Sequence, residues 1–214
     1  NVPWAAAGAL LVTACSGTAT RYSNALVKPT QTITDLKVLY LENKLIAERA
    51  TTGIVSLSQI GYTDLPELLR DRVPVVFNAQ GISTDYATIQ KQNFGQKEAI
   101  DSVKWANNGN AGTPLLIIQV VDGSALRDKY GTTFYLNLHA NLFDAKTQAR
   151  LWTGQFQNTI QYQAFNWNKF DNEFVDKMLM SVLTQMEKDG YVVLKAPKTA
   201  PQKTPPQNKR VEGR

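Results

Sequence analysis

Few residues of this chain have the types and spacing that catalysis or metal binding requires. The sequence contains one cysteine, Cys15, and one histidine, His139. A zinc site or a Cys–His nucleophile pair cannot be built from the usual ligands with so few of them. His139 lies in a stretch that alternates apolar and polar residues. A strand residue that hydrogen-bonds or faces water is therefore its simplest interpretation.

Three carboxylates, Asp122, Asp128 and Asp144, lie near the ends of expected strands. Asp is favoured at the first position of a turn, which explains Asp144 without catalysis, and Asp122-Gly123 also reads as a turn. None of the three has a partner at the spacing of a general acid and base. Gly-x-Ser-x-Gly, Gly-x-Gly-x-x-Gly and Walker-type loops are absent from the sequence. The sequence therefore predicts a protein that is not an enzyme and that binds no metal or cofactor.

The excess of positive charge is confined to the C-terminus. The formal net charge is +5, and residues 195–214 account for all of it. The rest of the chain is balanced and has no basic stripe of the kind that nucleic-acid-binding domains carry. We expect no nucleic-acid partner, and a disordered Pro-rich tail at 195–214. This tail is either solvated or in contact with anionic envelope polymers or phospholipids.

The N-terminal residues indicate a secretion signal. Residues 2–14 are apolar or small and carry no charge. Their number fits the h-region of a signal peptide, whereas a membrane-spanning helix needs about 20 residues. The positively charged n-region that normally precedes an h-region is missing. The sequence therefore predicts a signal-peptide h-region at 1–14.

The segment Val12-Thr13-Ala14-Cys15 resembles the lipobox of bacterial lipoproteins, in which an apolar residue and two small residues precede a cysteine. The resemblance implies that the chain is cut before Cys15 and that this residue is acylated, for example with palmitate. Ser16 in place of Asp implies export to the outer membrane, on its periplasmic face. Two or more acyl chains anchor a protein stably. An ordinary secretory peptide, or a buried helix that contains a cysteine, remains the alternative.

The composition divides the rest of the chain into a tether and one domain. Residues 15–32 are small and polar and predict a flexible lipid-to-domain tether. A single periplasmic domain is expected at 33–194. Its expected strands lie at 35–41, 82–89, 115–121 and 191–194, with a long antiparallel hairpin at 132–160.

Three helices are expected between or after these strands. The first covers 64–80, with Asp64 as its cap and a break at Pro74. The second covers 96–107. The third begins at the cap Asp171 and ends at Gly190. This order predicts an α/β (α+β) sandwich, a mixed sheet of about five to six strands with three helices packed on it.

The segment from Ala140 to Gly154 resembles one that recurs in bacterial envelope lipoproteins. A strand ends in Asp144-Ala-Lys-Thr, turns, and re-enters as Leu151-Trp152-Thr-Gly154, and a helix later ends in Asp189-Gly190-Tyr191. Residues 33–194 resemble the TolB N-terminal region, the curli-secretion lipoprotein and the penicillin-binding-protein activator lipoproteins. These motifs are short and structural. The resemblance therefore implies a fold and a location rather than one task.

An aromatic cluster is the candidate binding surface, because rings can stack on a partner or a glycan. An aromatic loop can also cap its own core. The cluster lies between the hairpin and the last helix and comprises Tyr162, Phe165, Trp167 and Phe170.

Taken together, the sequence predicts a membrane-anchored periplasmic lipoprotein. We expect it to act without catalysis, as an accessory or assembly subunit of an envelope machine for secretion, transport or cell-wall synthesis. Its expected partners are an envelope protein complex and the membrane that holds the lipid on Cys15, and a homo-oligomer remains open. The alternative is a module that binds peptidoglycan or another glycan through the aromatic loop at 162–170.

Overall fold

The computed structural model describes residues 17–43, 62–91, 112–129, 131–162 and 170–195. The helices in these ranges are the short 3-10 helix η1 (Tyr62–Asp64) and the α-helices α2 (Leu65–Ala79) and α4 (Asn172–Lys188). The strands are β1 (Gly17–Ala25), β2 (Asp35–Asn43), β3 (Ser83–Lys91), β4 (Leu115–Asp128), β5 (Gly131–Phe143) and β6 (Arg150–Tyr162).

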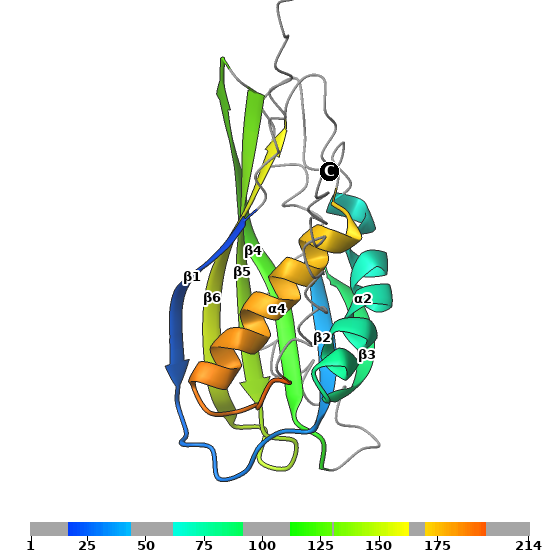
Figure 1. Ribbon diagram of the computed structural model, residues 1–214, viewed down its shortest axis with the longest axis vertical. Helices are drawn as coiled ribbons and strands as arrows, with labels where there is room; N and C mark the ends of the chain where they lie inside the picture. The colour runs from blue at the N-terminus through cyan, green and yellow to red at the C-terminus, as the bar shows by residue number, and fades with distance from the viewer. Residues whose placement is uncertain (1–16, 44–61, 92–111, 130, 163–169, 196–214) are drawn as a thin grey trace, which may run out of the picture.

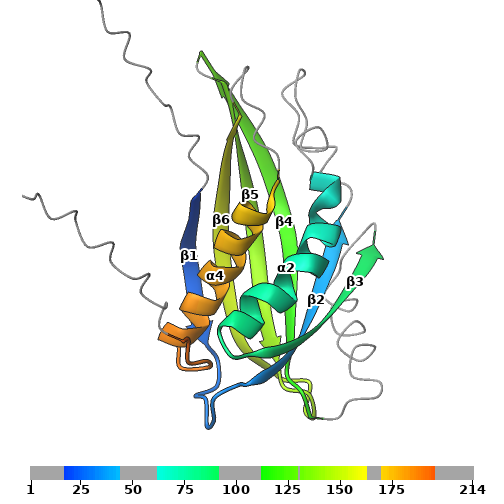
Figure 2. The same cartoon turned by 45° about the vertical axis from the view of Figure 1, so that its right-hand side comes forward.

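The strands form one mixed sheet in the order β1-β6-β5-β4-β2-β3. β2 is parallel to β3 and to β4, and the other neighbours are antiparallel. Parallel strands need a crossover connection, which α2 provides between β2 and β3. Both α2 and α4 lie on the same face of the sheet (Figures 1 and 2). The expected mixed sheet and its long hairpin, now β5–β6, are confirmed.

A hydrophobic core fills the space between the helices and the sheet. Along β5, every second residue is buried and the residues between are partly exposed. This is the period of a strand that has one face on a core. Helix α4 contributes a continuous apolar stripe to the same core: Phe174, Val175, Met178, Leu179, Val182, Leu183 and Met186.

Helix α4 begins and ends as its sequence predicts. The Asp171 carboxylate accepts a hydrogen bond of 2.8 Å from the backbone N–H of Phe174, and this satisfies one unpaired donor of the first turn. Gly190 follows the helix with φ of 85°, a conformation that glycine adopts without strain.

Helix α2 differs from the prediction at two points. Asp64 has helical dihedrals, φ −88° and ψ −8°, and its side chain makes no capping hydrogen bond. Asp64 is the last residue of η1, so the helical turn begins before it. Pro74 lies inside an unbroken helix. Proline costs one hydrogen bond there, and burial of Val73, Val76 and Phe77 in the core offsets the loss.

Strand β1 corrects the prediction of a flexible tether at 15–32. Residues 17–25 pair with β6 over their whole length. Thr18 Oγ1 donates to Asn158 Oδ1 at 2.7 Å, and Arg21 Nη2 donates to Gln157 Oε1 at 2.6 Å. The small and polar composition of the segment is that of an edge strand whose side chains are mostly exposed, and such composition does not differ from that of a linker.

Two further expectations change. The described residues contain two α-helices rather than three, and the expected helix at 96–107 lies outside them, as do residues 1–16 and 196–214. Residues 191–194 do not form an edge strand. Tyr191 and Val192 are instead buried in the core, and the Tyr191 carbonyl accepts a single backbone bond of 2.9 Å from Ile33.

The end of α4 is fastened to β6 through Trp152, which is fully buried. The indole Nε1–H donates to Asp189 Oδ2 at 2.6 Å. Asp189 is the C-cap residue of α4, so this bond joins the end of the helix to the sheet. We call this pair the Trp152–Asp189 latch.

Tyr191 and Gly154 complete the surroundings of the latch. The Tyr191 hydroxyl has one proton to donate and contacts two carbonyl oxygens, those of Val27 and Leu151, the latter at 2.7 Å. Gly154 lies against the Trp152 ring, where an added Cβ would be 2.5 Å from ring carbon Cη2. A glycine is therefore required for the indole to lie flat on β6.

A methyl group at Gly154 should destabilise the domain. Because Phe156 Cε2 would also lie 2.8 Å from that methyl, Gly154→Ala must displace one of two buried rings, and we expect a loss of about 1–3 kcal/mol in the free energy of unfolding. Urea denaturation followed by circular dichroism measures this. Gly17→Ala is the matched control, since nothing lies within 4 Å of its added methyl. Equal stability of the two variants would contradict the close packing of Trp152.

Candidate functional site

The face of the sheet opposite the two helices has an apolar and a polar part. Over β2 and the start of β4, a second cluster of buried residues covers it: Leu39, Leu41, Leu115 and Ile117. Over β1, β6, β5 and the rest of β4, residues on this face alternate with the buried ones and are partly or fully exposed. Aligned across four strands, they carry mainly amides, hydroxyls and one imidazole. We call this surface the polar sheet face, which comprises Tyr22, Gln119, Asp122, Asn137, His139, Asn141, Gln155 and Gln157.

His139 lies in the middle of the polar sheet face. Its cross-strand neighbours are Gln119 on β4 and Gln155 on β6, and Gln155 is paired in turn with Tyr22 on β1. Partial burial lowers the pKa of His139 below its usual 6.5, because desolvation disfavours the imidazolium. A neutral imidazole between two amides can exchange hydrogen bonds with a ligand, but these neighbours supply no carboxylate to orient it as a general base.

The three candidate carboxylates do not come together. The prediction of a turn at Asp122-Gly123 is wrong. Asp122 lies within β4, beside a β-bulge between Val120 and Asp122. The bulge adds one residue and so keeps the Asp122 carboxylate on the exposed face, where Asn137 Nδ2 donates to it at 3.5 Å. Asp128 ends β4 at the opposite end of the sheet from Asp144.

Asp144 has the turn role that its sequence position predicts. Its Oδ1 accepts hydrogen bonds from the backbone N–H of Thr147 at 2.7 Å, from the Thr147 hydroxyl at 2.8 Å, and from the N–H of Lys146 at 3.0 Å. The bonds from Thr147 are the main reason that the pKa of Asp144 lies below its usual value. The carboxylate therefore stabilises the β5–β6 turn.

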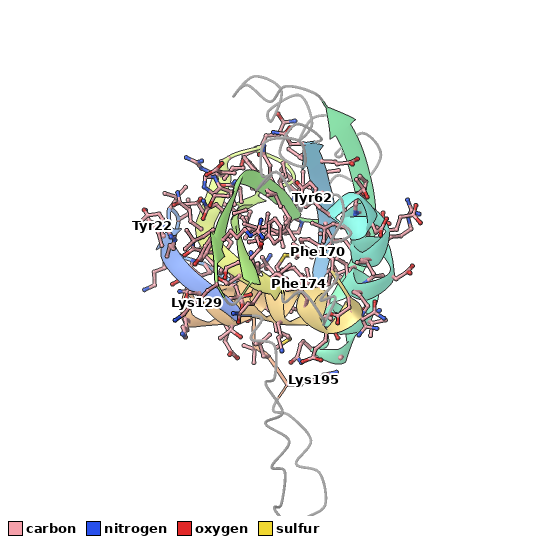
Figure 3. All side chains as sticks on the ribbon, turned by 90° about the horizontal axis from the view of Figure 1, so that it is seen from above. Tyr22, Tyr62, Lys129, Phe170, Phe174 and Lys195 are labelled. Carbon is pink, nitrogen blue, oxygen red and sulfur yellow. The ribbon has the colours of Figure 1, made fainter. Side chains whose placement is uncertain are left out.

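The predicted aromatic surface is corrected at Phe170. This ring is 5% exposed and packs edge-on against Tyr62 and Phe174, at centroid distances of 6.0 and 4.9 Å. Figure 3 shows the three rings in the interior of the domain, whereas Tyr22 lies at its periphery. Phe170 caps the core, which is the alternative that the sequence left open.

Of the other predicted site residues, the structure places the backbone of Tyr162 alone. Tyr162 ends β6, where it pairs with Thr132. Phe165 and Trp167 lie outside the described residues, and so does Cys15.

A buried polar cluster under the helices escaped the sequence analysis. Tyr40 and Glu42 face the core from β2, Tyr62 from η1, and Tyr86 from β3. Tyr86 donates to the carbonyl of Pro66 at 3.0 Å, but the hydroxyls of Tyr40 and Tyr62 and one oxygen of Glu42 make no hydrogen bond of good geometry. The period of β2 could have shown this cluster, since Leu36, Val38, Tyr40 and Glu42 share one face.

Burial raises the pKa of each of these three phenols. Desolvation is the largest cause throughout: it raises the pKa of Tyr62 and of Tyr86 to about 12, and that of Tyr40 well above 10.0. Electrostatic repulsion from Tyr62 raises the pKa of Tyr40 further. The three phenols are thus held neutral in the folded protein.

A groove of about 350 Å³ runs between the edge strand β1 and helix α4. β1 has a hydrogen-bonded neighbour on one side only among the described strands, and its Thr18 and Thr20 line the groove. We call this the β1–α4 groove. Hydroxyls, one amide, one thioether and two ammonium groups line it: Thr18, Thr20, Lys177, Met180, Ser181, Thr184, Gln185 and Lys188.

In the described ranges, no three His, Cys, Asp or Glu side chains gather closely enough to hold a metal ion. No helix of the described part of the chain is long and apolar enough to cross a membrane.

Over the described residues, the fold is α+β, a six-stranded mixed sheet with two α-helices on one face. No protein-family model matches the chain, and no curated protein matches it. Among solved structures, a PelC dodecamer from Paraburkholderia phytofirmans has 12% identity and a TM-score of 0.37, over 84% of this chain and 100% of that one. Lipoprotein GNA1162 from Neisseria meningitidis has 13% identity and a TM-score of 0.36, over 73% of this chain and 99% of that one. Protein CT253 from Chlamydia trachomatis has 6% identity and a TM-score of 0.43, over 75% of this chain and 98% of that one. TM-scores this low identify no family and no function.

The buried phenols should make the domain sensitive to alkali. An acid with a raised folded-state pKa keeps its proton where the unfolded chain loses it, so the free energy of unfolding falls as the pH rises from 10.0 towards about 12. Tyr40→Phe should lessen this fall. At neutral pH it should keep stability or raise it by up to about 1 kcal/mol, because it removes a buried hydroxyl without a good partner.

Urea denaturation at neutral and at alkaline pH measures both effects. Tyr22→Phe is the control, because this ring is 48% exposed on β1 and should leave the alkaline profile unchanged. A marked loss of stability in Tyr40→Phe at neutral pH would show that the hydroxyl has a partner after all.

Proposed function

We propose that this protein is a lipid-anchored accessory or assembly subunit of a bacterial envelope machine, which acts by binding a partner protein and not by catalysis. Its place in the proposal is the periplasmic face of the outer membrane. The observation that supports it most directly is the junction between the lipobox-like Val12-Thr13-Ala14-Cys15 and strand β1. One residue, Ser16, separates the proposed acylation site from the first residue of the sheet, Gly17.

This junction would fix the domain at the membrane. An extended chain spans at most about 3.6 Å per residue, so Gly17 would lie within roughly 7 Å of the lipidated residue. β1 is held to the sheet by its pairing with β6, and Gln185 of α4 donates to Ser23 at 2.8 Å. The domain would therefore not move freely at the end of a tether. Such a placement suits a subunit that meets its partner at a set height above the membrane.

The β1–α4 groove is the surface best suited to that partner. A strand edge can add an extended segment of another chain through backbone hydrogen bonds. Alternate side chains of the added strand would point over the helix face of the sheet, towards Lys177, Ser181 and Lys188. Lys177 already pairs with Glu173 at 2.7 Å. The groove thus favours an extended partner segment with hydroxyl or acidic side chains at every second position.

Loss of the thiol at residue 15 should release the protein from the membrane. In the wild type we expect the membrane-extracted chain to begin at Cys15 and to exceed the mass of its sequence by two or three acyl chains, as intact mass spectrometry measures. Cys15→Ser should carry no acyl mass and should leave the membrane fraction. Ser16→Ala is the control and should keep the acyl chains. A wild-type chain without acyl mass would contradict the anchor.

Binding of a glycan is the second candidate function, and the polar sheet face favours it. This surface carries the carboxylate of Asp122, and the Arg21 guanidinium donates to its Gln157 at 2.6 Å. The remaining amides, hydroxyls and imidazole of the surface are uncharged groups that both donate and accept hydrogen bonds. Neutral sugars offer the complementary hydroxyls, and Tyr22 offers a half-exposed ring on which a sugar could stack. The aromatic residues Phe165 and Trp167 stay predicted contributors.

Site-specific crosslinking and a double substitution on the polar sheet face separate the two functions. A photo-crosslinking residue at Thr184, in the groove, should give a discrete protein adduct in intact cells, whereas the same residue at Val75, which is 50% exposed on α2, should give none. His139→Ala and Asn137→Ala together should leave that adduct unchanged. If they instead abolish cosedimentation of the purified protein with peptidoglycan sacculi, the glycan function replaces the first. Hydrolytic turnover by a protein that forms no adduct would contradict both.

A further inference from the structure

The turn between β4 and β5 projects beyond the rest of the sheet. Its ends are Leu126–Lys129 and Gly131–Thr133, which we call the hairpin tip. Leu126 is 59% exposed, and Arg127 and Lys129 are exposed beside it. A single exposed leucine is ordinary on a protein surface. The position of this one, relative to the proposed anchor, is not.

The pairing registers place the hairpin tip at the anchored end of the domain. Gly17, the first residue of β1, is paired with Thr159, which is paired with Tyr135, which is paired with Ser124. β4 and β5 continue for four more residues past this row, about 13 Å at the rise of an antiparallel strand. Figures 1 and 2 show both strands extending past the start of β1.

The chain upstream of Gly17 cannot reach as far as the hairpin tip. Cys15 lies at most roughly 7 Å from Gly17, whereas the tip extends about 13 Å beyond the row of Gly17. Leu126 is two residues past that row, at the pair Leu126–Thr133. With the strands along the membrane normal, an acyl group on Cys15 buried in a leaflet would bring Leu126 and the residues after it to the level of the lipid headgroups.

The side chains of the hairpin tip have the chemistry of a membrane interface. An apolar side chain gains free energy on leaving water, and cationic side chains next to it are attracted to anionic phospholipids. The tip carries Arg127 and Lys129 against Asp128, an excess of positive charge. At physiological ionic strength this attraction acts over roughly 8 Å, so the tip cations must lie close to the headgroups to feel it.

We propose that the hairpin tip rests in the headgroup region of the same phospholipid leaflet that holds the acyl chains of Cys15. The inference rests on the proposed lipid anchor and adds a second contact with the membrane. Leu126 enters the interface, and Arg127 and Lys129 meet the phosphates. Two separated points of the sheet then touch one surface, which limits rotation of the domain within the plane of the sheet.

A fluorophore at position 126 tests the contact. Acylation occupies the sulfur of Cys15, the one cysteine of the chain, so Leu126→Cys supplies the single thiol for labelling with an environment-sensitive nitrobenzoxadiazole dye. In vesicles of phosphatidylethanolamine with a minority of phosphatidylglycerol, we expect several-fold brighter, blue-shifted emission and quenching by brominated lipid. Val75→Cys is the control, since this exposed residue lies near the end of α2, towards the far end of the sheet, and its emission should stay that of water.

Two outcomes separate this inference from the anchor on which it rests. If the acylated protein floats with the vesicles and the dye at 126 remains in water, the tip contact is wrong and the anchor stands. If the native chain proves not to be acylated, the same dye is read in a Cys15→Ser variant that a histidine tag directly before residue 15 holds on nickel-chelating lipid. A dye in water there also overturns the contact. Protection of the dye by a co-purified protein, with no quenching by brominated lipid, would assign the tip to that protein.

Discussion

The structure depends on the hydrogen bond between the Trp152 indole and the Asp189 carboxylate, 2.6 Å long and sealed by a fully buried ring. A bond to a charged acceptor is about twice as strong as a neutral one, and loss of the Asp189 carboxylate would leave the indole N–H of the buried Trp152 without its acceptor. Gln185 also approaches both oxygens of Asp189, at 3.5 Å. The bond therefore fixes the position of α4 along β6, and the common core beneath α4 follows from that position.

The latch also explains how a polar edge strand can be part of the fold. β1 buries little apolar surface of its own, as its mostly exposed residues show. It is held by its ladder with β6, by Ser23 against α4, and by the contact of the Tyr191 hydroxyl with the carbonyl of Val27 just after the strand. Two of these depend on the end of α4, which the latch places. A pull on the proposed anchor would thus be carried into the core.

The sequence predicted the elements whose burial has a strict period. The alternation of β5 and the apolar stripe of α4 each have one face in a core, so hydrophobic periodicity defined their type. The cap residues Asp171 and Gly190 defined the ends of α4. Where burial does not decide, prediction failed. β1 has the composition of a linker, and Asp64 resembles a cap although η1 had already begun the turn. The Asp122 bulge depends on register with β5, and register is a property of two strands that no single segment encodes.

The same reasoning explains two further failures of prediction. Tyr40 and Glu42 are buried in the core although they are polar, and Phe170 is buried in the core although it belongs to the predicted binding loop. Local sequence distinguishes apolar from polar residues, but not which end of a strand lies under a helix. Tyr40 and Glu42 are polar residues near the end of β2, where α2 and Phe170 close the core above them. An aromatic ring next to a helix cap is as well placed to cover that end as to bind a ligand, and only the neighbours in space decide.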